Sequence, residues 1–268
     1  MEKWRLLETG YADGVTNMAI DEAILLAVAK GKAPPTLRFY GWRPPCLSIG
    51  YGQSMREEID IERCKAAQID LVRRPTGGKA ILHSDEVTYS VVLPSSHPLA
   101  RGSVLESYRR LSWGLVQGLR ALGVKASQAG PLEEKQWLSA ACFEVPSDYE
   151  VECNGKKLIG SAQLRRKDAL LQHGSIPLRG DVTAIVDFLR LPPAQKERLR
   201  ARLRQRAITL EEILGRAVSF EEVVSAMVQG FKEAFGLQIT PGELTPFEKE
   251  EAERLRQKYS SDAWNLRH

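Results

Sequence analysis

The cysteines and one lysine are the residues of this 268-residue chain whose types first suggest covalent chemistry. Cys46, Cys64, Cys142 and Cys153 lie far apart, without a Cys-x-x-Cys pair or a histidine at zinc-site spacing. Lys157 follows Cys142 by fifteen positions. Because an ammonium close to a thiol favours the nucleophilic thiolate, this pair is a candidate for nucleophilic catalysis. Spacing alone leaves open the alternative of an inert cysteine and a surface lysine.

A pair of glycines follows a predicted strand and is flanked by cations. Residues 73–83 read Arg-Arg-Pro-Thr-Gly-Gly-Lys-Ala-Ile-Leu-His. Gly77 and Gly78 lack a Cβ and so let backbone N–H groups approach an anion or a carbonyl, while Arg74 and Lys79 add positive charge. The Gly-x4-Gly-Lys-Ser/Thr spacing of a Walker A loop is absent from the sequence. A β-turn between solvated cations is the structural alternative.

Small residues also gather further along the chain, in Gly160-Ser-Ala-Gln163 and in Gln172-His-Gly-Ser175. They permit close approach of the backbone to a ligand, or tight packing of a sheet against a helix. His173 is a candidate general base, with a packed structural histidine as the alternative.

A run of cations on one predicted helix suggests a binding role. Residues 196–206 contain six cations and one acid, whereas Leu199, Leu203 and Ala207 recur at four-residue spacing and can pack inward. The outward cations form either a solvated helix face or a docking surface for an acidic partner. No aromatic residue interleaves with them, so nucleic acid fits poorly.

The strands that must position these residues are predicted in the middle of the chain. They cover 36–40, 46–51, 69–74, 80–82, 87–93 and 169–178. A hairpin joins 149–153 to 156–159 through Asn154-Gly155, a pair suited to a type I′ turn. Residues 128–146 have weak periodicity and are predicted to be a loop.

Helices are predicted on both sides of this strand-rich region. One is capped by Thr16 and ends at Gly31, and the others cover 59–68, 103–122, 194–206, 209–214, 220–235 and 246–259. With strands dominating 36–178 and helices the remainder, the pattern indicates an α+β domain with a helical C-terminal flank.

Composition and charge are those of an ordinary globular chain. Hydrophobic residues make up 43% and charged residues 27%, and a net charge of +4 is too small to indicate nucleic-acid binding by itself. The N-terminus resembles no secretory signal, and the longest apolar stretch, 23–29, is too short to span a bilayer. The scattered cysteines favour reduced thiols and a cytoplasmic location over a disulfide framework.

Taken together, the ordered motifs resemble those of the lipoate–protein ligase A / biotin ligase-like family. They are Arg73-Arg-Pro-Thr-Gly-Gly-x4-His83, Gly155-Lys-Lys-Leu-Ile-Gly-Ser-Ala-Gln163 and Gln172-His-Gly-Ser-Ile176. The resemblance runs from the Asn17-Met-Ala-x-Asp-Glu22 helix to Trp264-Asn265, nearly the whole chain. Within the family, the segment Ala141-Cys142-Phe143-x-x-Pro146-Ser147 is similar to the octanoyl-[acyl-carrier-protein]:protein N-octanoyltransferase branch.

The resemblance implies a mixed β-sheet domain flanked by helices. It implies a catalytic domain at 1–240 and a C-terminal helical extension at 241–268 packed on it. It also implies that Cys142 is the acyl-thioester nucleophile, that Lys157 lowers the pKa of its thiol, and that an acyl tunnel lies near the glycine turn. The implied substrate-binding residues are Arg74, Gly77, Gly78, Lys79, Ala80, Ile81, Leu82, His83, Gly160 and Ser161. No cofactor and no metal are implied.

The implied reaction moves octanoyl from acyl carrier protein to a lysine of a lipoyl-domain protein, such as glycine cleavage H protein, in lipoate biosynthesis. We expect a monomer that binds neither nucleic acid nor membrane. Two departures separate the chain from ATP-dependent ligases of the family: Lys79 replaces the third glycine of their turn, and Ser84 follows His83 where they carry aspartate. A bulky side chain there hinders entry of a nucleotide. The alternatives are such a ligase, an octanoyl amidotransferase between lipoyl domains, and a non-catalytic binding protein.

Overall fold

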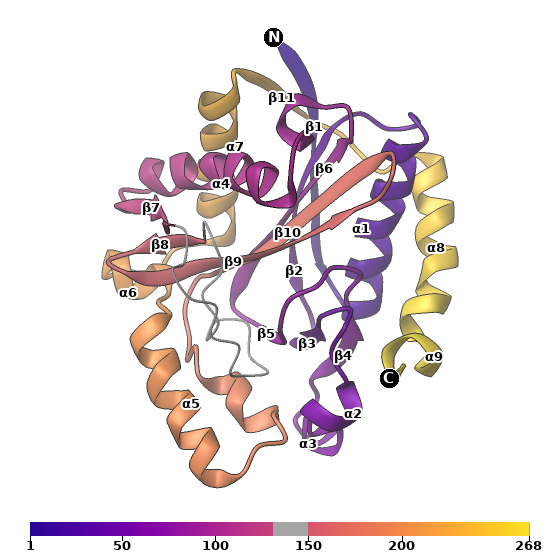
Figure 1. The fold of residues 1–268 in the computed structure, drawn as a ribbon. Coiled ribbons are helices and arrows are strands. Elements are labelled where there is room, and N and C mark those ends of the chain that lie inside the picture. Colours follow the sequence, from indigo (N-terminus) through magenta and orange to yellow (C-terminus); the bar gives the residue numbers. More distant parts are fainter. Residues whose placement is uncertain (131–149, 268) are drawn as a thin grey trace.

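The computed structural model of the chain describes residues 1–130 and 150–267 (Figure 1). Its largest element is a mixed sheet whose strands are β1 (Glu2–Ala12), β2 (Thr36–Trp42), β6 (Glu86–Pro94), β7 (Ala126–Gln128), β8 (Val151–Cys153), β9 (Lys156–Arg165), β10 (Ala169–Pro177) and β11 (Leu237–Pro241). Their order is β11-β1-β2-β6-β10-β9-β8-β7, with β1 parallel to β11 and β2 and the other neighbours antiparallel.

Helices cover both faces of this sheet (Figure 1). On one face lie α4 (Val104–Ala121) and α7 (Phe220–Phe235), and on the other lies α1 (Gly14–Ala29), backed by α8 (Pro246–Ser260) and α9 (Asp262–Asn265). Val91 of β6 packs in one apolar cluster with Leu115 and Phe231, whereas the next residue, Val92, packs in another cluster with Ile24. Since burial of such a side chain contributes roughly 1.5–3 kcal/mol, the two clusters hold the central strands firmly between the helix layers.

A smaller sheet carries the glycine turn. Its strands are β3 (Cys46–Ile49), β4 (Asp70–Arg73) and β5 (Ile81–His83), in the order β4-β3-β5, and the turn joins β4 to β5. Around this sheet and beside the larger one lie α2 (Met55–Glu58), α3 (Ile61–Ala66), η1 (Pro98–Ala100), η2 (Ala184–Phe188), α5 (Pro193–Arg206) and α6 (Leu210–Leu214). Leu199 and Leu203 of α5 pack with Leu47 and Ile185 in the apolar cluster of the small sheet.

Most of the predicted elements are confirmed, with small changes at their ends. Residues 220–235 form a helix as predicted, and Ser103 begins α4 with a capping box to Glu106. Asn154 and Gly155 have φ angles of 54° and 71°, as a type I′ turn requires. The predicted α+β class, a mixed sheet flanked by helices, is confirmed. None of the helices in the described part of the chain combines the length and apolar composition needed to cross a membrane.

The N-terminal helix begins one turn earlier than predicted. Thr16 was the predicted cap, but the N-cap is Asp13, whose side chain accepts a hydrogen bond of 2.6 Å from the backbone N–H of Thr16. The aspartate carboxylate is the stronger cap of the two, and the helix therefore starts at Gly14.

Two strands outside 36–178 were not predicted, one near each end of the chain. β1 precedes the first helix, and β11 lies between α7 and α8 and pairs with β1 in parallel. A five-residue strand whose only partner is far away in the sequence leaves little local periodicity to detect. The predicted loop is also wrong at its start, because Gln128 ends β7; residues 131–146 lie outside the described residues.

Candidate functional site

One pocket brings together five of the predicted substrate-binding residues, Arg74, Ile81, His83, Gly160 and Ser161. We call it the inner pocket; its other lining residues are Met18, Tyr40, Trp42, Ser48, Thr88, Ala162, His173, Gly174 and Ser175. Two of the three β9 residues, Ser161 and Ala162, are partly exposed, whereas the residues from α1 and β2 are buried. The inner pocket therefore opens along β9 and ends against α1 and β2.

The buried carboxylate of Glu86 lies behind one wall of the inner pocket. It accepts hydrogen bonds from His83 Nδ1 at 2.9 Å and from the Ser175 hydroxyl at 2.6 Å. Burial acts to raise the pKa of Glu86, but the attraction to His83 and the hydrogen bonds outweigh it and hold the pKa below its usual range. The His83 ring stacks on Trp42 with centroids 4.0 Å apart, and its Nε2 lies 2.8 Å from the Ser48 hydroxyl. The side chain of His83 is thus fixed at both edges and on one face.

A second buried carboxylate, Asp21 of α1, lies behind another wall. It accepts hydrogen bonds from Arg38 Nη1 at 2.7 Å, from Tyr40 and Ser90 hydroxyls at 2.9 Å each, and from His173 Nδ1 at 3.0 Å. Burial acts to raise the pKa of Asp21, but the Arg38 guanidinium and His173 lower it to about 2. Asp21 is therefore a permanent anion that orients four donors.

His173 of β10 is held by this anion on one side and by Thr76 on the other. Burial lowers the pKa of His173 in spite of Asp21, so the ring is neutral near pH 7. Because ionised Asp21 can only accept, the proton is on Nδ1, and Nε2 accepts from the Thr76 hydroxyl at 2.7 Å. With both nitrogens engaged, the geometry favours the structural interpretation of His173 over that of a general base.

The hydrogen-bond networks around Glu86 and Asp21 direct polar atoms away from the inner pocket. Tyr40, His83, His173 and Ser175 are polar by type, yet each directs its polar atoms toward Asp21, Glu86 or another partner in the wall. Since satisfied polar groups leave mainly carbon atoms facing the cavity, the surface offered to a ligand is largely apolar. Such a pocket suits a hydrocarbon chain, for which burial contributes about 0.8 kcal/mol per CH₂.

Arg74 holds the glycine turn in place. Its Nη2 donates to the carbonyl oxygens of Gly77 at 2.7 Å and Lys79 at 2.8 Å. Gly77 and Gly78 are exposed, Lys79 is half-buried, and the φ of Gly78, +88°, lies in the region that favours glycine. A Cβ on Gly50 would come within 2.0 Å of the Gly78 carbonyl oxygen, so the loop before α2 packs directly against the turn.

Arg73 points the other way and joins this loop to the C-terminal segment. Its fully buried guanidinium donates only to backbone carbonyls, those of Gly50 (3.2 Å), Tyr51 (2.9 Å), Gln53 (2.6 Å), Trp264 (3.0 Å), Asn265 (2.9 Å) and Arg267 (2.9 Å). Burial lowers the pKa of Arg73, yet a guanidinium stays charged far above neutral pH. One side chain thus ties residues 264–267 to the loop that supports the glycine turn.

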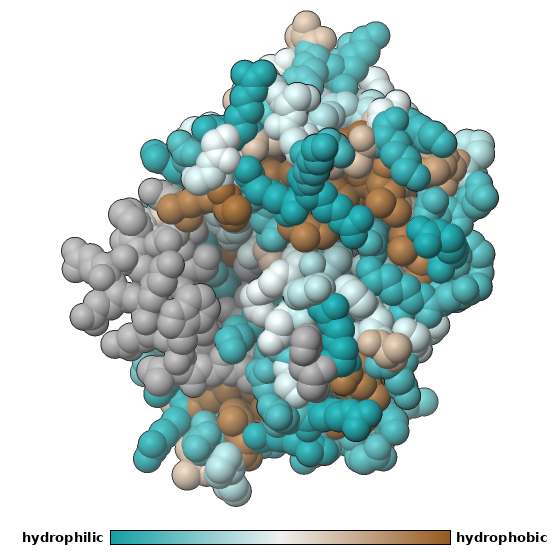
Figure 2. Space-filling view, turned by 45° about the vertical axis from the view of Figure 1, so that its right-hand side comes forward, coloured by the Kyte–Doolittle hydropathy of each residue, from teal (hydrophilic) through white to brown (hydrophobic). Residues whose placement is uncertain are grey.

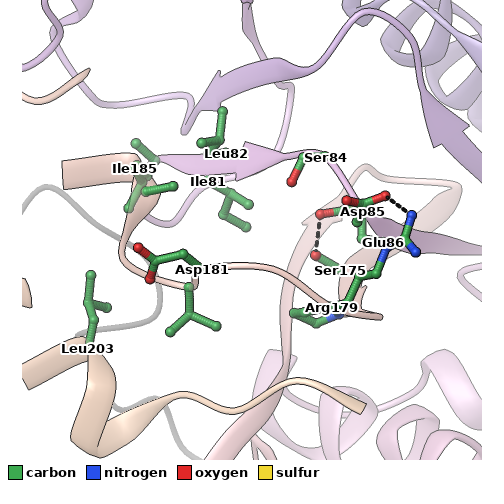
Figure 3. A pocket seen from close by; sticks show the side chains of 14 residues that line it. Ile81, Leu82, Ser84, Asp85, Glu86, Ser175, Arg179, Asp181, Ile185 and Leu203 are labelled. Atoms are coloured by element: carbon green, nitrogen blue, oxygen red, sulfur yellow. Dashed lines mark hydrogen bonds and ion pairs between the residues drawn. The ribbon is translucent and has the colours of Figure 1, made fainter. Parts of the chain in front are cut away.

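A second pocket, which we call the outer pocket (Figure 3), shares the lining residues Ile81 and Ser175 with the inner one. Ala80 and Leu82, two more of the predicted residues, line it. Its other lining residues are Ser84, Asp85, Glu86, Pro177, Arg179, Asp181, Val182, Ala184, Ile185 and Leu203. In Figure 3, Ile81 of β5, Ile185 of η2 and Leu203 of α5 converge on the cavity, and Arg179 forms an ion pair with Asp85 at its rim. The Arg74–His83 segment therefore lines two adjacent hollows.

Lys157 lies on β9 beside a bulge. Before the bulge Lys157 pairs with Glu152, and beyond it Ile159 pairs with Val151. Because paired residues share a face, Lys157 points away from the core side chains of Val151 and Ile159. It is nevertheless only 7% exposed and forms an ion pair with the equally buried Glu150. The ammonium of Lys157 is therefore held at the hairpin by its pairing with Glu150.

The predicted nucleophile, Cys142, lies outside the described residues. The other three cysteines are free thiols in buried positions. Burial raises the pKa of Cys46 well above its ordinary value, that of Cys64 to about 11, and that of Cys153 as well. Since only the thiolate reacts, none of these three is suited to nucleophilic catalysis.

The sequence profile of the lipoyl protein ligase A/B catalytic domain family matches residues 13–232, a range that contains every residue of both pockets. The chain belongs to this family. It is 51% identical over 273 residues to "Octanoyltransferase LipM" of Kyrpidia tusciae, with 100% of both chains covered.

Two solved structures of lipoate ligases share its fold. The bi-partite lipoate protein ligase of Thermoplasma acidophilum, described with its E2 lipoyl domain, has a TM-score of 0.83 at 29% identity and covers 99% of this chain and 96% of that one. A lipoate-protein ligase A bound with ATP has a TM-score of 0.80 at 29% identity, with 99% of each chain covered.

Several residues of the site were not predicted from the sequence. The end of the inner pocket, with Met18 and Trp42, carries no signal that separates it from ordinary core. Asp21 did leave a signal, because it is an acid in a largely apolar helix and a buried acid requires partners, whereas Glu86 stands at the first position of β6, where its burial depends on the fold around it. Glu150 lies within the predicted hairpin strand 149–153, but its burial depends on the fold around it.

Proposed function

We propose that this chain is an octanoyltransferase of lipoate biosynthesis that works through an acyl-thioester on Cys142. The observation that carries the proposal is the identity of 51%, over the whole length of both chains, with the K. tusciae octanoyltransferase. The apolar inner pocket supports it, because its wall suits an alkyl chain. The raised pKa values of the other cysteines support Cys142 by elimination.

In the proposed first half-reaction the Cys142 thiolate attacks the carbonyl carbon of an octanoyl thioester on acyl carrier protein. A new C–S bond forms, the old one breaks, and the carrier thiolate leaves and takes up a proton. Lys157 stabilises the attacking thiolate, and the backbone N–H groups of Gly77, Gly78 and Gly160 stabilise the negative oxygen of the intermediate.

In the second half-reaction the uncharged amine of the target lysine attacks the same carbonyl. An amide bond forms, Cys142 leaves as thiolate, and the nitrogen loses a proton. A lipoyl domain is the proposed acceptor, supported by the T. acidophilum ligase described with its E2 lipoyl domain; the H protein of glycine cleavage is the specific candidate. Since an amide is more stable than a thioester, no ATP is needed.

The test is the intact mass of the protein after incubation with octanoyl carrier protein in the absence of ATP. We expect one octanoyl increment, located on the peptide that contains Cys142, and its loss in Cys142→Ala. Cys153→Ala is the matched control and keeps the increment, because its buried thiol does not react.

Each alternative gives a different result in this assay. An unmodified enzyme that works only with ATP and free octanoate is a ligase, like the relative bound with ATP. An increment that arises only from an octanoylated lipoyl domain indicates an amidotransferase. Binding of either protein without any adduct indicates a non-catalytic role.

A further inference from the structure

Helix α5 has a higher net positive charge than the protein as a whole. Its residues include six cations and one acid, a net charge of +5, whereas the complete chain has +4. The remainder of the molecule therefore has a net charge of −1. The face drawn in Figure 2 is largely hydrophilic with apolar side chains in separate patches, so this surface presents no single broad apolar interface.

Four of the six cations of α5 fall into two groups. Lys196 and Arg200 turn toward η2, where Lys196 donates to the Asp187 carbonyl at 3.1 Å and Arg200 forms an ion pair of 2.7 Å with the Asp187 carboxylate. Arg198 and Arg204 are exposed, and their side chains form no ion pair with any residue that the structure describes. Two arginines of α5 thus present uncompensated charge to solvent, and Leu199 and Leu203 anchor the helix beneath them.

The end of α5 is attached directly to the strand that carries Lys157. Lys156 Nζ donates to the Arg204 carbonyl at 3.1 Å, and the backbone N–H of Ile208 donates to the Lys157 carbonyl at 3.1 Å. On its inner side, Leu203 lines the outer pocket (Figure 3), and Ile81 lines both this pocket and the inner one. In Figure 1, α5 lies at the end of the molecule away from the N-terminus, below β9. A protein seated on α5 is therefore held next to both pockets and the Lys157 hairpin.

We infer that α5 is the docking surface for the donor protein, a carrier with an acidic face that presents the octanoyl thioester on a flexible arm. This rests on the proposed function. Charge complementarity identifies an acidic partner and speeds its encounter by long-range attraction. The outer pocket favours the donor over the acceptor, because a long arm can pass from α5 along this hollow, whereas a lysine side chain is short.

The test compares Arg198→Glu/Arg204→Glu with a matched control, Lys65→Glu/Lys249→Glu, which makes the same change of charge at exposed cations elsewhere. Binding of acyl carrier protein is measured by titration, independently of any catalysis. We expect its Kd to rise at least about tenfold in the α5 variant at low salt, to approach the wild-type value at high salt, and to change little in the control.

The two half-reactions are then measured separately. Acyl-enzyme formation from octanoyl carrier protein is expected to slow, while formation from octanoyl-pantetheine and transfer from isolated acyl-enzyme to a lipoyl domain stay at the wild-type rate. Equal losses in the α5 and control variants, or a loss confined to the lipoyl-domain step, overturn the inference. Failure of the wild-type enzyme to form any acyl-enzyme overturns the proposed function instead, and the binding titration still decides the role of α5.

Discussion

Replacement of Asp21 by asparagine removes the charge at the centre of the larger buried network and keeps the shape of the side chain. The carboxylate accepts hydrogen bonds from Arg38, Tyr40, Ser90 and His173. An amide offers one acceptor oxygen and turns an NH₂ group toward some of these donors. The Arg38 guanidinium also loses its buried counter-charge. Removal of one partner from a buried ion pair costs about 3–5 kcal/mol, a large part of the roughly 5–15 kcal/mol that stabilises a typical domain.

The lowered pKa of Asp21 gives a second value for the free energy by which its ionised carboxylate stabilises the folded state. A fall from 3.8 to about 2 corresponds to about 2.5 kcal/mol at roughly 1.4 kcal/mol per pH unit. This value is smaller than the about 3–5 kcal/mol expected for Asp21→Asn. Protonation leaves both carboxyl oxygens in place, whereas asparagine replaces one of them with an NH₂ group that faces other hydrogen-bond donors. Since the pKa of Asp21 is lower in the folded state, its contribution is present above pH 3.8 and is lost as the pH falls toward 2. The pKa of His173 is also lowered by folding, so its contribution is likewise lost in acid, from below pH 6.5.

Urea unfolding at pH 7 tests this reasoning. With a slope of about 3 kcal/mol per M, the upper end of the range for small proteins, Asp21→Asn is expected to lower the midpoint by roughly 1–2 M. It is also expected to remove the part of the acid-dependent loss of stability that Asp21 contributes below pH 3.8. Ser90→Ala is the control; it removes one neutral donor and is expected to lower stability by about 0.5–1.5 kcal/mol. If Asp21→Asn is no more destabilising than Ser90→Ala, the network does not hold the pocket wall.

Three further variants test the site itself. Lys157→Ala is expected to slow alkylation of Cys142 by iodoacetamide at neutral pH by about tenfold, whereas Lys156→Ala leaves it unchanged; equal rates remove Lys157 from thiol activation. Met18→Ala enlarges the closed end of the inner pocket, and competition between acyl chains of increasing length is expected to favour chains longer than octanoyl. Unchanged chain preference would place the acyl tail elsewhere. Arg73→Lys is expected to raise KM for the octanoyl donor several-fold without affecting alkylation of Cys142, because a lysine cannot serve six carbonyls around the glycine-turn loop. A change in alkylation rate instead would indicate a general loss of structure.

The elements that the sequence predicts well have strong local signals. Capping residues and apolar stripes placed α4 and α7 within a residue of their ends, and the Asn-Gly pair placed the turn between β8 and β9, although β9 continues six residues beyond its predicted end. β11 escaped prediction because its partner β1 lies more than 230 positions away, with Leu237 paired to Glu2; β1, which pairs with both β11 and β2, was missed as well. Non-local pairing of this kind leaves no periodic pattern in either segment.

The candidate site was also predicted only in part: its motif residues were found from the sequence, but the partners of its wall residues were not. The motif residues Arg74, Ile81, His83, Gly160 and Ser161 do meet in one pocket, although they come from two different sheets. The apolar character of the inner pocket wall could not be predicted from the sequence. Its apolar character depends on which partner each polar side chain finds, and those partners are contributed by α1, β2 and β6.

The Arg73-Arg74 pair shows what this motif encodes. Read as charge, two adjacent arginines before a glycine turn suggest direct binding of an anionic ligand. In the structure both guanidinium groups are buried and donate to backbone carbonyls on opposite sides of β4, so they fix the position of the turn. The Lys79 carbonyl is among the groups held by Arg74, and the backbone at this point has little freedom to move. A side chain at residue 79, where ligases have glycine, must then occupy space beside the turn. For that reason the substitution argues for a thioester relay over binding of a nucleotide.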